Sequence, residues 1–69
     1  MSQTLLDTAE DLEWLHSIHG IPITRVRVAI LYGNKDCPHK VETYTRNSVN
    51  CKPITYIYNE LEDRYDEVH

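Results

Sequence analysis

The chain has 69 residues, of which 41% are hydrophobic and none is Phe, and its formal net charge is −4. A chain of this length forms one domain, residues 1–69, and buries only about 60% of the surface that its unfolded form exposes. Four acids stand where a signal peptide would be apolar, and no apolar run approaches the roughly 20 residues of a membrane span. We therefore expect a cytoplasmic protein with no membrane contact, in which both cysteines, Cys37 and Cys51, are reduced.

The charged residues are sorted along the chain into three blocks. Residues 1–20 hold four acids and no Lys or Arg, a net charge of −4. Residues 21–52 hold six basic residues against two acids, a net of +4, and residues 53–69 hold five acids against one Arg, a net of −4. The electrostatic fields of such segregated charges influence which partners bind more than they determine the fold. The pattern therefore predicts separate interaction surfaces of opposite charge.

The first predicted element is a helix within residues 4–19, which Gly20 ends. Two N-caps compete for its start. Thr4 would begin a longer helix, whereas Asp7 followed by Glu10 resembles a capping box and would begin a shorter one. We favour the shorter helix, because it separates its apolar from its polar residues more completely around the helix axis. Its expected core side consists of Leu12, Trp14, Leu15, Ile18 and His19.

A β-hairpin is predicted next, because residues 23–32 and 39–46 alternate and are rich in β-branched side chains. The intervening residues 33–38 are dense in turn formers and give a six-residue loop. Pairing Ile30 with Val41 buries the face that carries the valines. The same register gathers basic and aromatic residues on the opposite face, namely Arg25, Arg27, Lys40, Tyr44 and Arg46.

The C-terminal segment, residues 53–68, is predicted to be a helix that begins at Pro53. A strand over 54–58 is the alternative, since Thr, Tyr and Ile favour β structure, but it leaves Leu61 without a role. We favour the helix, in which Tyr56 faces solvent. The apolar stripe that supports it consists of Ile54, Ile57, Tyr58, Leu61, Tyr65 and Val68.

These elements predict an α+β fold, a small α-β-β-α domain with two helices on one face of an antiparallel β-hairpin. A sheet of two strands is marginally stable in water. Edge-to-edge pairing of two hairpins would give four strands and cover an exposed edge. We therefore expect a homodimer that extends the sheet.

The residues that could bind a metal do not have the spacing of a zinc site, since no Cys-x2-Cys or His-x3-His element is present. They are His16, His19, Cys37, His39 and Cys51. A nucleophilic Cys37 beside His39 would still need an orienting group and an oxyanion site. No glycine-rich phosphate loop is present either. We expect no metal, no cofactor and no enzymatic activity.

Two surfaces remain as candidate binding sites. The first is an acidic surface on the helix faces, which would dock onto a basic site of another protein around an exposed aromatic anchor. Its residues are Tyr56, Glu60, Asp63, Glu67, Glu10 and Glu13.

The second candidate is the basic face of the hairpin, which would bind nucleic acid through Arg25, Arg27, Lys40, Tyr44 and Arg46. The sequence pI of about 5.4 is low for a dedicated nucleic-acid binder, so we favour neutralisation of the basic face by protein, either by the acidic helices or by a dimer mate. The expected function is that of a small interaction protein, such as an inhibitor, adaptor or accessory factor of the kind that a phage or mobile element encodes.

Overall fold

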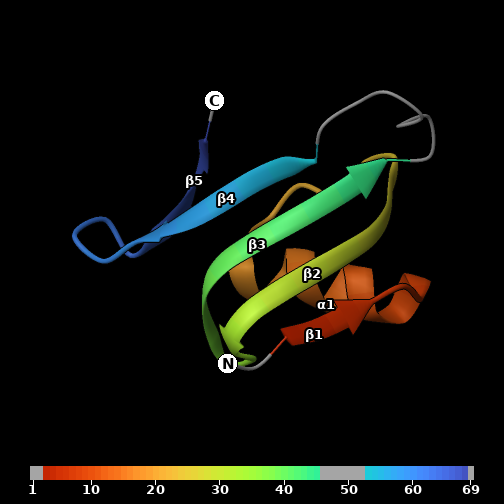
Figure 1. The fold of residues 1–69 in the computed structure, drawn as a ribbon, viewed down its shortest axis with the longest axis horizontal. Coiled ribbons are helices and arrows are strands. Elements are labelled where there is room, and N and C mark those ends of the chain that lie inside the picture. The colour runs from red at the N-terminus through yellow and green to blue at the C-terminus, as the bar shows by residue number, and fades with distance from the viewer. Residues whose placement is uncertain (1–2, 46–52, 69) are drawn as a thin grey trace.

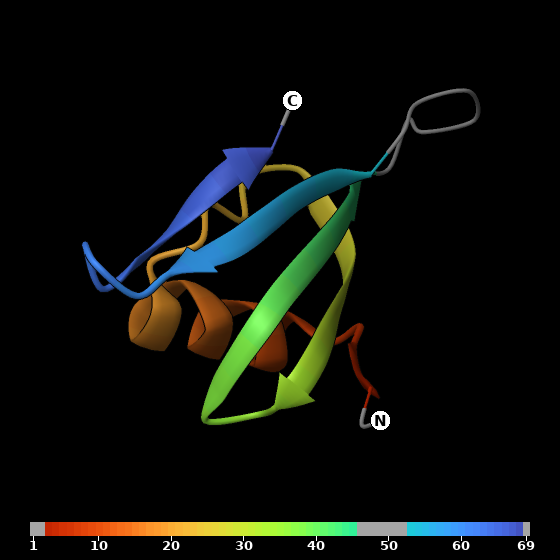
Figure 2. The same ribbon diagram turned by 60° about the vertical axis from the view of Figure 1, so that its left-hand side comes forward.

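The computed structural model describes residues 3–45 and 53–68. One helix and one antiparallel sheet make up the fold, and the strand order in the sheet is the order in the chain. The helix lies on one face of the sheet, and the sheet curves around it (Figures 1 and 2). The elements are β1 (Gln3–Leu6), α1 (Ala9–His19), β2 (Val26–Asn34), β3 (Cys37–Thr45), β4 (Ile54–Asn59) and β5 (Arg64–Val68).

This architecture corrects the predicted α-β-β-α fold. The described chain has one helix, and the segment predicted as the second helix is the β4–β5 hairpin. The sheet already has five strands within one chain, so dimerisation is not needed to extend it. The predicted pairing of two hairpins into four strands is therefore wrong.

The predicted N-terminal helix is present in its shorter form. Thr8 is the N-cap, and its hydroxyl accepts a hydrogen bond from the Asp11 amide at 3.1 Å. At the other end Gly20 has φ of 69° and donates its backbone N–H to the His16 carbonyl, which confirms the predicted stop. Both predicted N-caps are wrong, since Thr4 lies in β1 and Asp7 precedes the cap.

The helix packs its core face through Leu12 and Leu15, which are both buried as predicted. Trp14 is half-buried and packs against the edge of the core. Ile18 was expected on the core side but is 60% exposed. One side of α1 thus fills the hollow of the curved sheet.

The β2–β3 hairpin is present, but its register is one residue away from the predicted one. Val41 pairs with Leu31, and Glu42 pairs with Ile30. Leu31 and Val41 are fully buried under α1, while Ile30 points to the opposite face. A slip of one residue exchanges the two faces of a strand, so the predicted face of β2 is wrong. The buried core consists of Leu6, Leu12, Leu15, Ile21, Ala29, Leu31, Val41 and Tyr56.

A bulge beside the turn causes this shift. The strands pair at Tyr32 with Lys40 and then at Gly33 with Pro38, so His39 is the extra residue of β3. Gly33 has φ of 101°, and a Cβ atom there would lie 2.7 Å from Nδ1 of His39. The positive φ favours glycine at this position, and any larger residue would also displace the His39 ring. The turn itself is two residues long, because Asn34 pairs with the residue at 37, and not six as predicted.

The C-terminal segment forms strands because its apolar residues also alternate. Tyr56 points to the helix side and is only 7% exposed, whereas Ile57 points to the other face. Leu61, expected in the buried stripe, lies in the turn and is 96% exposed. The predicted burial of Tyr56 and Leu61 is therefore reversed.

The burial of Tyr56 and the exposure of Leu61 can be tested through the stability of two variants. Tyr56→Ala removes a buried aromatic side chain and should lower the free energy of unfolding by about 3 kcal/mol, at the lower end of the range for buried aromatics. Leu61→Ala removes a side chain that is in water already, and should change it by less than about 0.5 kcal/mol. Urea denaturation of the two variants measures both changes. A larger loss in Leu61→Ala than in Tyr56→Ala would contradict the observed fold.

Candidate functional site

The turn between β4 and β5 is the most strongly exposed apolar point of the described chain. Four residues, 60–63, join the strands, since Asn59 pairs with Arg64. Three of them are acidic, and the fourth is Leu61. We call Glu60, Leu61, Glu62 and Asp63 the acidic tip.

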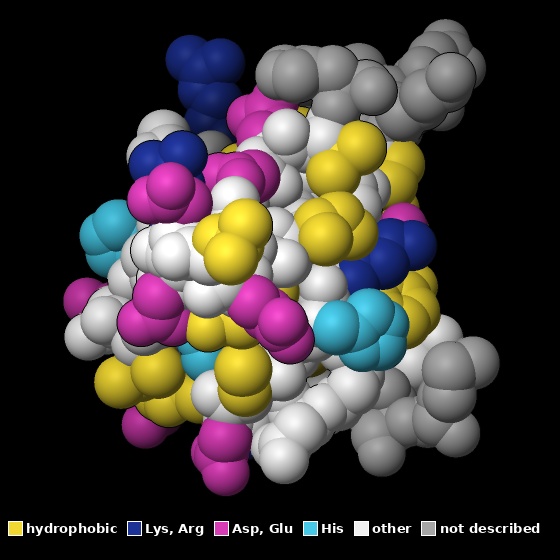
Figure 3. Space-filling model, turned by 90° about the vertical axis from the view of Figure 1, so that its left-hand side faces the viewer, with side chains coloured by type: hydrophobic (Ala, Val, Ile, Leu, Met, Phe, Trp, Pro, Cys, Tyr) yellow, Lys and Arg dark blue, Asp and Glu magenta, His cyan; other side chains and the backbone are white. Residues whose placement is uncertain are grey.

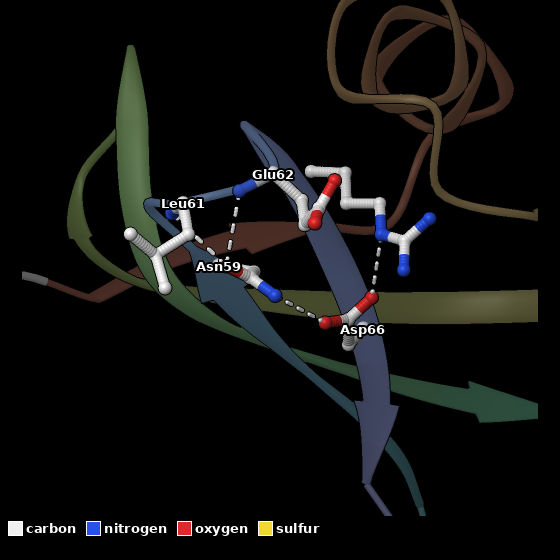
Figure 4. A network of polar contacts seen from close by, with 5 residues as sticks. Asn59, Leu61, Glu62 and Asp66 are labelled. Carbon is white, nitrogen blue, oxygen red and sulfur yellow. Dashed lines mark hydrogen bonds and ion pairs between the residues drawn. The ribbon is translucent and has the colours of Figure 1, made fainter.

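The Asn59 side chain holds the backbone of the acidic tip in place (Figure 4). Its Oδ1 atom accepts hydrogen bonds from the amides of Leu61 at 3.0 Å and Glu62 at 3.1 Å. Its Nδ2 atom donates to Oδ2 of Asp66 at 2.9 Å, and Nε of Arg64 donates to Oδ1 of the same carboxylate at 3.0 Å. Asn59 thus closes the turn and joins it to β5, as Asn side chains do in tight turns.

A second contact fixes the far side of the turn. The Tyr58 hydroxyl donates a hydrogen bond to Oδ1 of Asp63 at 2.5 Å. This hydrogen bond raises the pKa of Tyr58 to about 12, because ionisation would place a phenolate against the carboxylate. Asp63 has φ of 53°, a conformation that Asp and Asn tolerate better than most residues. Two neighbouring side chains of β4, Tyr58 and Asn59, therefore hold the acidic tip at both of its sides.

Leu61 borders an apolar hollow on the side of the hairpin. Ile57 and Val68, which are 40% and 50% exposed, line this hollow together with His39. Its volume is about 650 Å³, and Glu60 and Asp66 are also among its lining residues. The arrangement is a shallow apolar surface with carboxylates at its border.

Acidic and hydrophobic side chains lie side by side over this end of the molecule (Figure 3). The C-terminal end of α1 is close to the acidic tip, because Ile18 and His19 share a hollow of about 240 Å³ with Asp63. His19 also makes edge-on ring contacts with Trp14 at 5.2 Å and with Tyr65 at 5.5 Å. An aromatic cluster therefore supports the hairpin on the helix.

The six residues predicted for the acidic surface are divided among the acidic tip, α1, β4 and β5. Glu60 and Asp63 are together in the acidic tip, while Glu10 and Glu13 are exposed on α1. The two others belong to paired strands, where Glu67 lies opposite Tyr56. Burial of Tyr56, with a smaller contribution from the Glu67 charge, raises the pKa of its phenol. Tyr56 is thus not the exposed anchor that was expected.

The predicted basic residues do not form one face. Lys40 lies 3.8 Å from Glu42 and over the ring of Tyr32, at 5.0 Å from its centre. Tyr32 also donates its hydroxyl to Glu42, which raises the pKa of that phenol to about 12. The positive charge of Lys40 is therefore balanced by Glu42 of the same strand, and not by the acidic helices that were expected to neutralise it.

The other members of the basic set are dispersed. Arg25 is exposed with φ of 67° and precedes β2, and Arg27 is exposed at a bulge. Tyr44 pairs with Val28 instead of Arg27. Arg46 lies outside the described residues. The described part of the chain thus leaves two exposed arginines with no basic strand face around them.

Two of the metal-capable residues, His16 and His19, have a ring nitrogen close to a backbone carbonyl. Nδ1 of His16 lies 3.1 Å from the Ile21 carbonyl, and Nε2 of His19 lies 3.3 Å from the Lys35 carbonyl. Within residues 3–45 and 53–68, no three His, Cys, Asp or Glu residues are grouped to hold an ion. Cys37 is exposed and free, and Cys51 lies outside the described residues.

Sequence reasoning missed Asn59 and Leu61, which define the acidic tip. The helical spacing of Leu61 from Ile57 and Tyr65 assigned it to a buried stripe. The turn contains neither Gly nor Pro, so the usual markers of a hairpin are missing. The available signal was Asn59 at the end of an alternating run and directly before a polar segment.

Comparison with known proteins finds no family model, no curated protein and no solved structure that matches this chain. Among the described residues no helix has the length and apolar character to cross a membrane. The inference of function therefore depends on the geometry of the site.

The Tyr58–Asp63 hydrogen bond can be tested by titration. Asp63→Asn removes the carboxylate and keeps a residue that accepts positive φ, so the pKa of Tyr58 should fall from about 12 toward 10. Because its pKa is raised in the folded state, the tyrosine contributes stability below about pH 10, and this is lost as the pH rises through 12. NMR of the tyrosine ring carbons follows the titration. An unchanged Tyr58 titration in Asp63→Asn would contradict the hydrogen bond.

Proposed function

We propose that the protein is a small non-enzymatic interaction protein of the cytoplasm, which docks its acidic tip onto a basic site of another protein. It would act by occupying that site, as an inhibitor, adaptor or accessory factor does. The observation that carries the proposal is Leu61, a large apolar side chain that is 96% exposed on a turn held by hydrogen bonds.

The anchor of this interface would be Leu61. A leucine exposed to this extent on a fixed turn gains from entering an apolar pocket, and burial of such a side chain contributes about 1.5 to 3 kcal/mol. The Asn59 hydrogen bonds support the proposal because a turn that is ordered beforehand loses little entropy on binding.

The charge of the acidic tip would select the partner. Glu60, Glu62 and Asp63 surround the leucine, and no Lys or Arg lies within the turn. Arg64, the nearest cation in the sequence, is already paired with Asp66. Complementary charge raises the rate of encounter and excludes acidic partners, so the expected site has Lys or Arg around an apolar pocket.

Leu61→Ser tests the anchor, with Leu5→Ser as the matched control. Both residues are exposed leucines, but Leu5 lies in β1, at the opposite edge of the sheet from β5. When the partner is captured from a lysate of the source cells, the wild-type chain and Leu5→Ser should retain it, and Leu61→Ser should retain at least about tenfold less. Quantitative mass spectrometry of the three captures measures the difference.

The charge requirement has its own test. Glu60→Gln with Glu62→Gln should weaken binding of the captured partner and make its affinity less dependent on salt, since two carboxylates no longer face the basic site. Surface plasmon resonance at several salt concentrations measures this. Equal capture by Leu61→Ser and the wild type, or an unchanged salt dependence, would contradict the proposal.

A further inference from the structure

Two hollows border the acidic tip, one on each side of the β4–β5 hairpin. The hollow lined by Leu61, Ile57 and Val68 lies on the side of the sheet away from α1. The other hollow, of about 240 Å³, is lined by Asp63 of the acidic tip and by Ile18 of α1. A partner that docks on the acidic tip therefore has two surfaces next to it, and their charges distinguish them.

The surface on the α1 side is rich in carboxylates. Asp36 and Asp63 line the hollow between the helix and the acidic tip, and Glu10 and Glu13 line another hollow along α1. Arg64 is the one Lys or Arg among the described residues that line these two hollows, and its Nε atom is paired with a carboxylate of β5 at 3.0 Å. The field of this surface is therefore suited to a basic partner.

The charges on the other side of the acidic tip are largely paired. Of the two acids that line that hollow, Glu60 and Asp66, the second is paired with Arg64 at 3.0 Å. On β3, which neighbours β4, Lys40 lies 3.8 Å from Glu42. Because these charges cancel in pairs, a basic partner gains more from the α1 side.

Ile18 connects the two hollows of the α1 side. It lines both of them, and its aliphatic side chain is 60% exposed. Covering such a side chain removes apolar area from water, which favours binding. Ile18 thus has on the helix the surroundings that Leu61 has in the turn, an exposed aliphatic side chain with carboxylates close to it.

Contacts of His19 and Tyr65 fix the end of α1 relative to the sheet. Nε2 of His19 lies 3.3 Å from the carbonyl of Lys35 in the β2–β3 turn, and its ring makes an edge-on contact with Tyr65 of β5. The Tyr65 hydroxyl donates to the Pro38 carbonyl at 2.8 Å. Ile18, which precedes His19, is therefore held in place beside the acidic tip, and ordering it on binding costs little entropy.

From these observations we propose that the partner bound by the acidic tip also covers this surface of α1, with Ile18 as a second apolar anchor. Lys or Arg side chains of the partner lie opposite Asp36 and Asp63. The inference rests on the function proposed for the acidic tip and adds to it, because the basic site of the partner then needs a second apolar contact on the helix side.

Trp14 allows binding to be followed in the unlabelled chain, because it is the single tryptophan and lines the hollow along α1. The probe is a short peptide of alternating Lys and Leu, which presents cations and apolar side chains together. Its binding should change the Trp14 fluorescence, whereas a peptide of alternating Glu and Leu should not bind. In NMR spectra the amide signals of Ile18 and Asp63 should shift, and that of Leu5 should not.

Ile18→Ala tests the second anchor and should raise the dissociation constant of the Lys–Leu peptide at least about fivefold. Val68→Ala is the matched control, since this residue is an aliphatic that is 50% exposed on the other side of the acidic tip, and it should bind like the wild type. Circular dichroism checks that each variant is folded.

Asp36→Asn tests the charge of the hollow and should make the affinity for the same peptide less dependent on salt. Asp7→Asn makes the same charge change at an exposed residue that lines neither hollow of the α1 side, and it is the control.

Three outcomes would overturn the inference: a wild-type chain that does not bind the Lys–Leu peptide, Ile18→Ala that binds it like Val68→Ala, or equal salt dependence in Asp36→Asn and Asp7→Asn. The function proposed for the acidic tip is judged separately, by the partner captured with Leu61→Ser. Loss of that partner in Leu61→Ser, together with unchanged peptide binding in Ile18→Ala, would keep the proposed function and remove α1 from the interface.

Discussion

A single helix has to shield a sheet of five strands, and the rest of the structure depends on this constraint. Eleven residues of α1 cover one face, and the sheet curves around them so that Leu12 and Leu15 reach the side chains of β2 and β3. A second layer on the other face would require apolar residues that a chain of 69 does not have. No described element therefore covers the face of the sheet opposite α1, where Leu5, Ile57 and Val68 are exposed.

The sequence predicted the elements that have local markers. Gly20 ended the helix where expected, and the turn formers near Gly33 located the first hairpin. The register of that hairpin was not predictable from alternation, because Val28 and Ile30 are as apolar as Ala29 and Leu31 on the other face. Burial under α1 decides between the two faces, and the extra residue His39 adjusts the pairing.

The C-terminal hairpin was mistaken for a helix because its apolar residues satisfy two periods at once. Ile54, Ile57 and Leu61 have helical spacing, while Ile54, Tyr56 and Tyr58 alternate as in a strand. A turn closed by Asn59 and by Asp63 at positive φ carries no Gly or Pro to mark it. Glu60 and Asp63 of the candidate site were predicted from the sequence. Leu61, its apolar anchor, was wrongly assigned to the core, and Tyr56, which is buried, was wrongly assigned to the surface.

The order of strands in the sheet has a consequence for how the chain reaches its fold. Each strand pairs with the strand that precedes it in the chain, so no strand has to be inserted between two that have already paired. Short loops close the β2–β3 and β4–β5 hairpins, and closing short loops costs little entropy. Contacts between sequence neighbours are typical of fast-folding domains. The sheet can therefore grow from one edge to the other in the direction of synthesis, with the hairpin that carries Leu61 added last.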